Sequence, residues 1–255
     1  MKKQENVTKK CLFGLLGKDI SYSFSSGYFR EKFLALKHTN YEYHNFDIQK
    51  IEDFRPLIIA NKENLKGLNV TIPYKQVVMS YLDEIDEDAL KIGAVNTIKI
   101  TKDGKLKGYN TDVYGFQKSL EPLLESQHTN ALILGTGGAA KAVAFVLQAL
   151  DIDFLYVSRD PKSEKEISYK ELDETALKRY RLLINCTPLG TFPETEKSPN
   201  IPYQFVGKEH LLYDLIYNPS VTTFLSNGKK RGASIKNGLE MLQLQAEKSW
   251  KIWNF

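Results

Sequence analysis

The sequence predicts an α/β protein with two domains, and three observations support this fold class. Short apolar runs alternate with segments of helical periodicity along most of the chain. The length of 255 residues fits one large or two small domains, because a domain usually holds roughly 100–200 residues. Hydrophobic residues make up 42% and charged residues 26%, a mixture typical of a globular protein with a buried core.

The first half repeats an alternation of strand and helix. An apolar run over 11–16 predicts a buried strand. A serine-rich segment over 21–26 can cap a following helix, in which Phe29, Phe33, Leu34 and Leu36 recur at helical spacing. The alternation continues with a strand over 41–46, a helix over 48–60, a strand over 67–72, a short helix near Pro73 and an acidic helix over 83–90.

A hairpin and a helix cap mark the end of the first domain. The runs 94–100 and 105–109 flank Asp103-Gly104, a strong turn signal, so this sheet contains an antiparallel pair and is mixed. Asn110, Thr111 and Asp112 favour the start of a helix over 113–124. We therefore expect one domain over 1–111 plus 238–255 and a second over 112–237.

The second domain shows the same rhythm. The pattern predicts strands over 131–134, 154–157, 182–184, 211–213 and 233–235, a helix that ends near Leu150, a helix over 221–230 and a terminal helix over 238–250. Parallel strands that alternate with helices predict a doubly wound sheet.

Composition limits the function classes. The net charge of +4 is mild and no long Lys/Arg block occurs, so we expect an anionic small molecule as partner and no nucleic acid. No run approaches the roughly 20 apolar residues of a membrane helix. The basic start, Met1 to Lys3, lacks a signal core, and Cys11 and Cys186 resemble packed, reduced thiols, with one disulfide as the alternative. These features predict a cytoplasmic protein.

A glycine-rich turn predicts a Rossmann-like dinucleotide site. Gly135-x-Gly137-x-x-Ala140 lies between a predicted strand and a predicted helix, where Gly135 permits the tight turn and Gly137 lets the backbone approach a pyrophosphate. Gly138 and Ala139 open the helix, whose free N–H groups face the anion. A plain tight connection is the alternative.

The end of the next strand selects the dinucleotide. Arg159 follows Ser158 where a cation can bind a 2′-phosphate, which favours NADP. Asp160 is adjacent and could instead accept the hydroxyls of a free ribose, so NAD stays possible. An exposed loop charge is the structural alternative for Arg159.

Polar residues gather where a strand of the first domain ends and turns through Pro73. Asn69, Thr71 and Lys75 bring amide, hydroxyl and ammonium groups to one end of a sheet, where they can form a small polar pocket. Taken alone, Lys75 is typical of a surface lysine and Asp112 of a helix cap. We find neither an HExxH motif nor a Cys/His cluster with metal-ligand spacing, so no metal is expected.

Together these motifs resemble the shikimate dehydrogenase family over nearly the whole chain. The matching segments, in family order, are Gly17-x-x-Ile20-x-x-Ser23-x-Ser25, Gly67-x-Asn69-Val70-Thr71-x-Pro73-x-Lys75, Gly93-Ala94-Val95-Asn96-Thr97, Gly108-x-Asn110-Thr111-Asp112, Gly135-x-Gly137-Gly138-Ala139-Ala140, Asn185-x-Thr187-x-x-Gly190, Asp214-x-x-Tyr217-x-Pro219 and Gly238-x-x-Met241-Leu242-x-x-Gln245. The resemblance implies NADPH-dependent reduction of 3-dehydroshikimate to shikimate, a step of chorismate and aromatic amino acid biosynthesis.

The resemblance also implies residue roles. Lys75 and Asp112 are the expected catalytic pair. The expected substrate-binding residues are Ser23, Ser25, Asn69, Thr71, Asn96, Tyr217 and Gln245. The expected cofactor-binding residues are Gly135, Gly137, Gly138, Ala139, Ser158, Arg159, Thr187 and Gly238. Helix caps at Ser23 and Ser25, a plain turn at Tyr217 and a packed polar residue at Gln245 are the structural alternatives.

Two other functions stay open at this point. One is an NAD-preferring quinate/shikimate dehydrogenase, and the other is a non-catalytic NADP-binding module. The sequence departs from the family pattern at Ser26, Thr136 and Ser158, and a second arginine after Arg159 is absent, with Lys162 or Lys165 as substitutes. The chain is expected to be a monomer or a homodimer.

Overall fold

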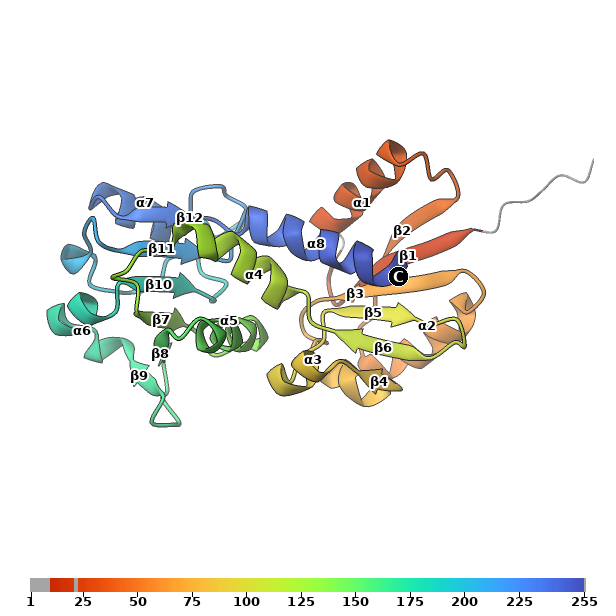
Figure 1. Ribbon diagram of the computed structural model, residues 1–255, viewed down its shortest axis with the longest axis horizontal. Helices are drawn as coiled ribbons and strands as arrows, with labels where there is room; N and C mark the ends of the chain where they lie inside the picture. The colour runs from red at the N-terminus through yellow and green to blue at the C-terminus, as the bar shows by residue number, and fades with distance from the viewer. Residues whose placement is uncertain (1–9, 21–22, 255) are drawn as a thin grey trace, which may run out of the picture. The chain divides into compact units, whose positions relative to one another are not determined.

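The computed structural model describes residues 10–20 and 23–254, which form two compact units (Figure 1). Unit 1 contains the described residues up to Thr111 and those from Lys248 onward, and unit 2 contains Asp112–Glu247. The expected boundary after residue 111 coincides with this division, whereas residues 238–247, expected in the first domain, pack with unit 2. The basic start of the chain and the predicted capping residue Ser21 lie outside the described residues.

Unit 1 is built on a mixed sheet. Its strands are β1 (Cys11–Gly17), β2 (Tyr41–Asp47), β3 (Leu65–Val70), β4 (Glu84–Ile85), β5 (Thr97–Ile100) and β6 (Leu106–Tyr109). Their order in the sheet is β2-β1-β3-β5-β6-β4, in which β5 runs antiparallel to both β3 and β6 and the other pairs are parallel. The predicted mixed sheet is confirmed.

The helices of unit 1 are short. They are α1 (Phe24–Ala35), α2 (Phe54–Asn61) and α3 (Glu87–Ile92), with 3-10 turns η1 (Ile51–Asp53) and η2 (Val77–Tyr81). Phe29 and Phe33 of α1 are buried as expected. Leu34, which was predicted from the same helical spacing, lies outside the core with 74% of its surface exposed. The expected acidic helix over 83–90 is wrong at its start, because β4 forms there and Asp86 caps α3 by accepting from the Asp88 N–H.

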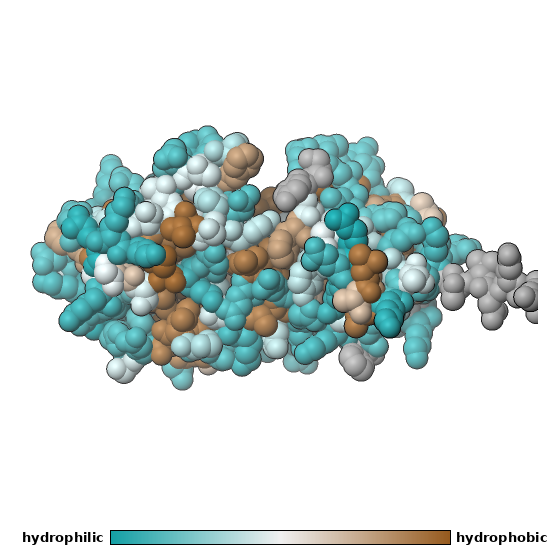
Figure 2. All heavy atoms as spheres, turned by 90° about the horizontal axis from the view of Figure 1, so that it is seen from above, coloured by the Kyte–Doolittle hydropathy of each residue, from teal (hydrophilic) through white to brown (hydrophobic). Residues whose placement is uncertain are grey.

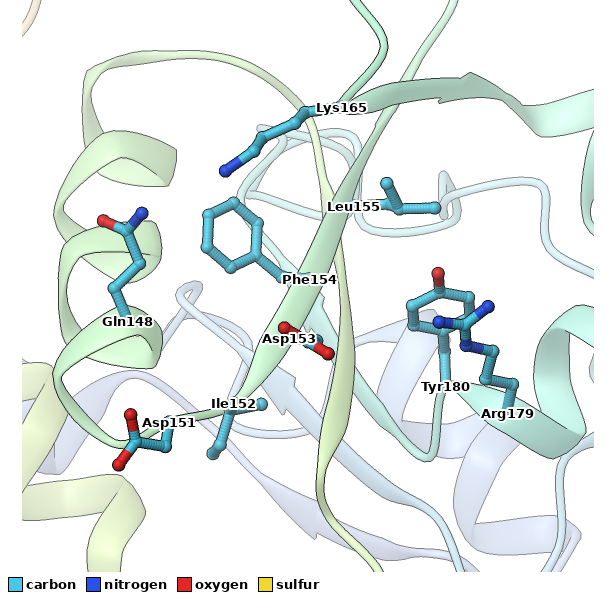
Figure 3. Close-up of a pocket in the computed structure, with 9 residues that line it drawn as sticks. All are labelled: Gln148, Asp151, Ile152, Asp153, Phe154, Leu155, Lys165, Arg179 and Tyr180. Carbon is cyan, nitrogen blue, oxygen red and sulfur yellow. The ribbon is translucent and has the colours of Figure 1, made fainter.

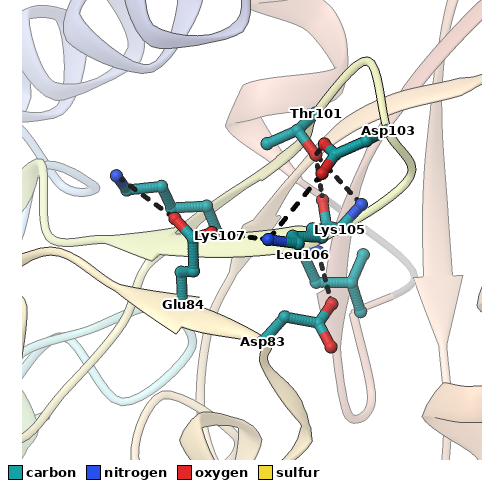
Figure 4. Close-up of polar contacts among 7 residues, drawn as sticks. All are labelled: Asp83, Glu84, Thr101, Asp103, Lys105, Leu106 and Lys107. Atoms are coloured by element: carbon teal, nitrogen blue, oxygen red, sulfur yellow. Dashed lines mark hydrogen bonds and ion pairs between the residues drawn. The ribbon is translucent and has the colours of Figure 1, made fainter.

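The hairpin of β5 and β6 holds β4 through polar contacts (Figure 4). The Thr101 hydroxyl donates to Asp103 at 2.6 Å and accepts from the Lys105 N–H at 2.9 Å, which closes the turn. Asp83 accepts the Leu106 N–H at 2.7 Å. The Glu84 carboxylate pairs with the ammonium groups of Lys105 at 3.3 Å and Lys107 at 3.6 Å. These contacts explain why the acidic segment is extended here.

The last turns of α8 (Leu239–Asn254) pack on the sheet of unit 1 through tryptophan. The Trp253 indole N–H donates to the Ile98 carbonyl at 3.0 Å, and Trp253 also lies 5.0 Å from the Phe13 ring, centroid to centroid. A Cβ atom on Gly67 would lie 2.2 Å from the Trp253 ring nitrogen, so only glycine fits there. This packing anchors the end of α8 to β1, β3 and β5.

Unit 2 is a parallel sheet with helices on its faces. Its strands are β7 (Asn130–Leu134), β8 (Asp153–Ser158), β9 (Glu166–Ser168), β10 (Leu182–Asn185), β11 (Leu211–Asp214) and β12 (Ser234–Lys236), in the order β12-β11-β10-β7-β8-β9. Its helical elements are α4 (Asp112–Leu120), α5 (Gly138–Ala149), α6 (Glu174–Arg179), α7 (Thr223–Lys230) and α8 as far as Glu247, with 3-10 turns η3 (Glu121–Leu123), η4 (Tyr169–Glu171) and η5 (Tyr203–Phe205). The predicted Rossmann-like sheet is confirmed, and β9 and α6 were not predicted.

Two apolar clusters, one containing Phe116 and Val143 and the other Leu177 and Phe224, form the core of unit 2. Within unit 2, α4 packs closely against α8. A Cβ atom on Gly115 would lie 2.5 Å from the Met241 carbonyl oxygen. The backbones of α4 and α8 are therefore in direct contact at Gly115.

The surface in Figure 2 is largely hydrophilic with small hydrophobic patches. Among the described residues, no helix is both long enough and apolar enough to cross a membrane. In the same part of the chain, no cluster of three His, Cys, Asp or Glu residues could hold a metal ion, and Cys11 and Cys186 are free thiols.

Candidate functional site

The predicted substrate-binding residues of unit 1 lie at one edge of its sheet. The carboxyl ends of the parallel strands β1 and β3 meet at this edge, and they lead to Ser23 and to Thr71. Because β5 runs antiparallel to β3, its amino end, preceded by Asn96, lies at the same edge. The end of β6, which leads to Thr111, lies there too, because Tyr109 is paired with Thr97.

The two serines at the start of α1 differ in their contacts. Ser23 is the N-cap of α1, and its hydroxyl oxygen accepts from the Ser26 N–H at 3.4 Å. This contact confirms the capping alternative for Ser23 without excluding a second partner. Ser25 is buried in the first turn, and its side chain hydrogen-bonds to the Tyr43 phenol.

Asn69 is the hub of a buried polar network. Its side-chain oxygen accepts from the Tyr43 hydroxyl at 2.9 Å. Its side-chain nitrogen donates to Ser249 Oγ at 3.0 Å and to Thr97 Oγ1 at 3.3 Å. Asn69 is only 4% exposed, so these internal partners and not solvent satisfy its amide. The sequence pattern indicated a direct role in a polar pocket, and the structure shows that Asn69 ties β3 to β5 and α8.

Asn96 performs a similar task one strand further. Its side-chain oxygen accepts from the Thr111 N–H at 2.7 Å and from the hydroxyls of Thr111 and Thr97, each at 3.2 Å. The hydroxyls of Thr97, Thr111 and Ser249 also bond to one another. The network thus fixes the backbone that enters α4.

Lys75 lies in a turn that is held from both sides. At the start of the turn, the Thr71 N–H donates to the Leu16 carbonyl at 2.9 Å. At its end, the Lys75 carbonyl accepts from the Val95 N–H at 2.7 Å. The neighbouring Tyr74 phenol donates to the Ile48 carbonyl at 2.7 Å. The backbone at Lys75 is therefore placed by strands on two sides of β3.

The glycine-rich turn of unit 2 has the geometry expected for an anion cradle. Gly135 has a φ of +104°, and a Cβ atom there would lie 3.1 Å from the Thr187 methyl group. Gly137 is the N-cap of α5 and has no side-chain cap, and a Cβ atom on it would meet nothing within 4 Å. Ala140 is fully buried against the sheet. Gly138 and Ala139 form the first turn, so the amino end of α5 is open to an anion.

The loop after β8 carries charges of both signs. Ser158 ends β8, and its hydroxyl accepts from the Asp160 N–H at 3.2 Å. Arg159 is exposed beside this turn. The Lys162 ammonium lies 3.9 Å from the Asp160 carboxylate, whereas the Lys165 ammonium lies over the Phe154 ring, 5.5 Å from its centroid. Lys165 therefore points toward the opposite end of β8 from Ser158.

Asp214 organises the edge of the sheet that carries Thr187. Its carboxylate accepts from the hydroxyl of Thr222 at 2.6 Å, from the Asn185 amide at 3.0 Å and from the Ile216 N–H at 3.0 Å. Asn185 in turn accepts the Thr187 hydroxyl at 2.7 Å. Burial raises the pKa of Asp214 to about 6 despite these donors. The sequence motif contained Asp214 without indicating that its carboxylate is buried.

The remaining predicted site residues belong to the helical part of unit 2. Asp112 begins α4 and is largely buried. Gln245 lies on α8, where its amide donates to the Leu242 carbonyl at 3.0 Å. Tyr217 follows the buried Ile216 in the segment after β11. Gly238 lies where a Cβ atom would be 2.1 Å from the Leu215 carbonyl oxygen, so close backbone packing explains this glycine.

A separate pocket of about 420 Å³ contains none of the predicted site residues (Figure 3). It lies at the amino end of β8, opposite Ser158, and its lining includes Asp153, Phe154, Lys165 and Arg179. In doubly wound sheets ligands bind at the carboxyl ends of the strands. The pocket is therefore not part of the candidate site.

Sequence reasoning missed Tyr43, Thr97 and Ser249 as members of the site network. Tyr43 and Thr97 lie in segments that resemble ordinary strands, and Ser249 is a single hydroxyl on a helix that is otherwise rich in charged and aromatic residues. Only the pairing of β2, β1 and β3 and the return of α8 bring these side chains together. A single sequence carries no signal of that proximity.

Known proteins resemble this chain over nearly its whole length. A family model described as the shikimate dehydrogenase substrate binding domain matches residues 15–98. A curated protein of Methanococcus maripaludis, named shikimate dehydrogenase (NADP(+)), is 41% identical over 96% of this chain and 92% of its own. A crystal structure of a shikimate dehydrogenase in complex with NADP+ superposes with a TM-score of 0.84 at 36% identity, covering 96% of this chain and 90% of that one. A quinate dehydrogenase from Corynebacterium glutamicum in complex with NAD has a TM-score of 0.85 at 25% identity, covering 96% and 93%.

Proposed function

The chain belongs to the shikimate dehydrogenase family, and we propose on this premise that it catalyses the reversible NADPH-dependent reduction of 3-dehydroshikimate to shikimate. The observation that carries this function is the 41% identity to a curated NADP-dependent relative over nearly both full lengths. The protein is thus an oxidoreductase that acts on a CH–OH group, in the route to aromatic amino acids.

We assign the proton transfer of this reaction to Lys75 and the orientation of the substrate to Asp112. Reduction of the carbonyl creates an alkoxide, and a positioned ammonium both stabilises this charge and donates a proton to the oxygen. Lys75 supplies that ammonium, and the turn described above fixes its backbone between Leu16 and Val95. Asp112 orients the substrate hydroxyl. Oxidation of shikimate reverses the transfer, so Lys75 then accepts the proton.

The substrate carboxylate and ring hydroxyls require donors and acceptors at fixed positions. We assign Ser23, Ser25 and Tyr217 to the carboxylate, and Thr71, Asn96 and Gln245 to the ring hydroxyls, with Asn69 close by. Support comes from the shared sheet edge of the unit 1 members and from the buried network behind them. Tyr217 and Gln245 come from unit 2. Unit 1 is accordingly the main substrate-binding part, which is also what the matched family model describes.

Unit 2 is assigned to the dinucleotide. The open space in front of Gly137 and the uncapped amino end of α5 fit a pyrophosphate. Arg159 fits a 2′-phosphate, because the guanidinium offers a planar fork of donors and Asp160 has Lys162 beside it. The same edge of the sheet also carries the other predicted cofactor-binding residues, which are Gly135, Gly138, Ala139, Ser158, Thr187 and Gly238. When bound, NADPH supplies the hydride.

The test is a turnover assay that follows nicotinamide absorbance with shikimate and quinate, each with NADP and with NAD. We expect the highest kcat/KM with shikimate and NADP. Faster turnover of quinate with NAD would instead support an NAD-preferring quinate/shikimate dehydrogenase. Dinucleotide binding without any turnover would identify a non-catalytic module.

A further inference from the structure

Tyr43 lies between two residues assigned to the substrate. Its phenol bonds to the side chain of Ser25 on one side and donates to the Asn69 side-chain oxygen, at 2.9 Å, on the other. The Tyr43 ring stacks on Phe29 with a centroid distance of 4.7 Å and an interplanar angle of 12°. The ring position is therefore set by packing, and the hydroxyl is left for polar contacts.

The Tyr43 hydroxyl and the Asn96 carbonyl, which accepts from the Asn69 side-chain nitrogen at 3.5 Å, together fix which way the Asn69 amide faces. An amide oxygen can only accept hydrogen bonds and an amide nitrogen can only donate them. With the phenol donating to the oxygen, the nitrogen faces the hydroxyls of Ser249 and Thr97. Without that donor, the buried oxygen loses the one partner that the structure gives it among the described residues.

The consequences reach the substrate through the backbone. Asn69 is two residues before Thr71 and lies at the end of β3, from which the turn to Lys75 leaves. Its amide joins this strand end to β5 and α8. A loosened Asn69 therefore loosens the start of the segment that contacts substrate.

We propose that Tyr43 is a positioning residue for substrate recognition, which acts by holding the Asn69 amide. This inference rests on the proposed function, because it assumes that the sheet edge beside Asn69 binds the substrate ring. Burial raises the pKa of the Tyr43 phenol, so the hydroxyl keeps its proton and remains a donor at neutral pH. Tyr43 itself transfers no proton in the reaction.

The test compares Tyr43→Phe with Tyr213→Phe. Both variants remove one buried phenol hydroxyl that takes part in a hydrogen bond. The Tyr213 hydroxyl lies 2.6 Å from Ser119 Oγ in the core of unit 2 and therefore serves as the control. We expect Y43F to raise KM for shikimate about tenfold, the range expected for one lost buried hydrogen bond, while kcat and KM for NADP change less than about twofold. We expect Y213F to lower the thermal stability as much as Y43F does, and to leave KM for shikimate unchanged.

A double-mutant cycle with Asn69→Ala tests the route. If Tyr43 acts through Asn69, Y43F changes KM for shikimate less than about twofold once Asn69 has been replaced. Additive effects of Y43F and N69A, or a wild-type KM in Y43F, would overturn the inference. If Y43F does not fold, Asn69→Ser breaks the same bond from the other side and must raise KM alike. A wild-type enzyme without activity on shikimate would refute the proposed function, which is a different outcome.

Discussion

The side-chain oxygen of Asn96 accepts a hydrogen bond from the backbone N–H of Thr111 at 2.7 Å. Both residues are at least 97% buried, and Thr111 is followed by Asp112, the first residue of α4. Asn96 therefore has a structural contact in addition to its proposed contact with the substrate. It also sets the backbone that delivers Asp112.

Replacing Asn96 by Ala should affect stability and catalysis together. The Thr111 N–H loses its partner in a buried position, so the free energy of unfolding should fall by about 1–3 kcal/mol. A shift in Asp112 should lower kcat/KM for shikimate by up to about a hundredfold. Urea unfolding and steady-state kinetics measure the two effects. Asn254→Ala is the control, since this exposed amide bonds only within its own helix in the described contacts. Wild-type stability and kinetics of N96A would disprove that Asn96 positions the backbone before Asp112.

Replacing Arg159 by Ala should change the choice of cofactor. A guanidinium paired with a phosphate contributes about 1.5–3 kcal/mol, so the ratio of kcat/KM for NADP over that for NAD should fall about 10–100-fold. Lys165→Ala is the matched control, because its ammonium lies over Phe154 at the other end of β8. An R159A enzyme that keeps the wild-type ratio would show that another group selects the cofactor.

The buried Asp214 predicts a specific pH dependence of stability. Its pKa is raised from 3.8 to about 6, so the folded protein binds this proton more tightly than the unfolded chain does. The contribution of Asp214 to the free energy of unfolding is therefore largest below pH 4, and it decreases as pH rises to about 6. A shift of this size corresponds to about 3 kcal/mol.

The measurement is urea unfolding of wild type and Asp214→Asn between pH 4 and pH 8. The asparagine variant lacks the titrating carboxyl, so the stability of D214N relative to wild type should rise as pH increases from about 4 to about 6. A difference between the two proteins that is constant over this range would show that Asp214 does not titrate there.

The sequence predicted most strands and the glycine turn because these depend on local patterns. The apolar runs at 131–134 and 182–184 coincide with β7 and β10, and Asp103-Gly104 does lie between β5 and β6. The boundaries were less accurate. The apolar period suggested a helix from residue 48, whereas α2 begins at Phe54 after a 3-10 turn. The strands β4 and β9 are two and three residues long, too short to show a period.

The site was predictable as a set of residues and not as an arrangement. The roles of Lys75 and Arg159 stay predictions; Lys75 was identified through the family resemblance and Arg159 because it follows a strand of the dinucleotide motif. The dependence of Asn69 on Tyr43 and Ser249 was not, because these residues are 26 and 180 positions away in the sequence. The second domain was expected to end at residue 237, whereas the compact unit continues to Glu247, for a related reason. The helix α8 is continuous, and packing of Gly115 against Met241 places its first half in unit 2.

The turnover of Lys75→Ala tests the central assignment most directly. With shikimate and NADP, we expect kcat to fall about 10²–10⁴-fold while KM for shikimate stays within about threefold, because the ammonium acts on charge that develops in the transition state. The exposed Lys62→Ala serves as the control and should behave as wild type. If K75A oxidises shikimate with the wild-type kcat, Lys75 does not carry the proton and the mechanism proposed for this enzyme is wrong.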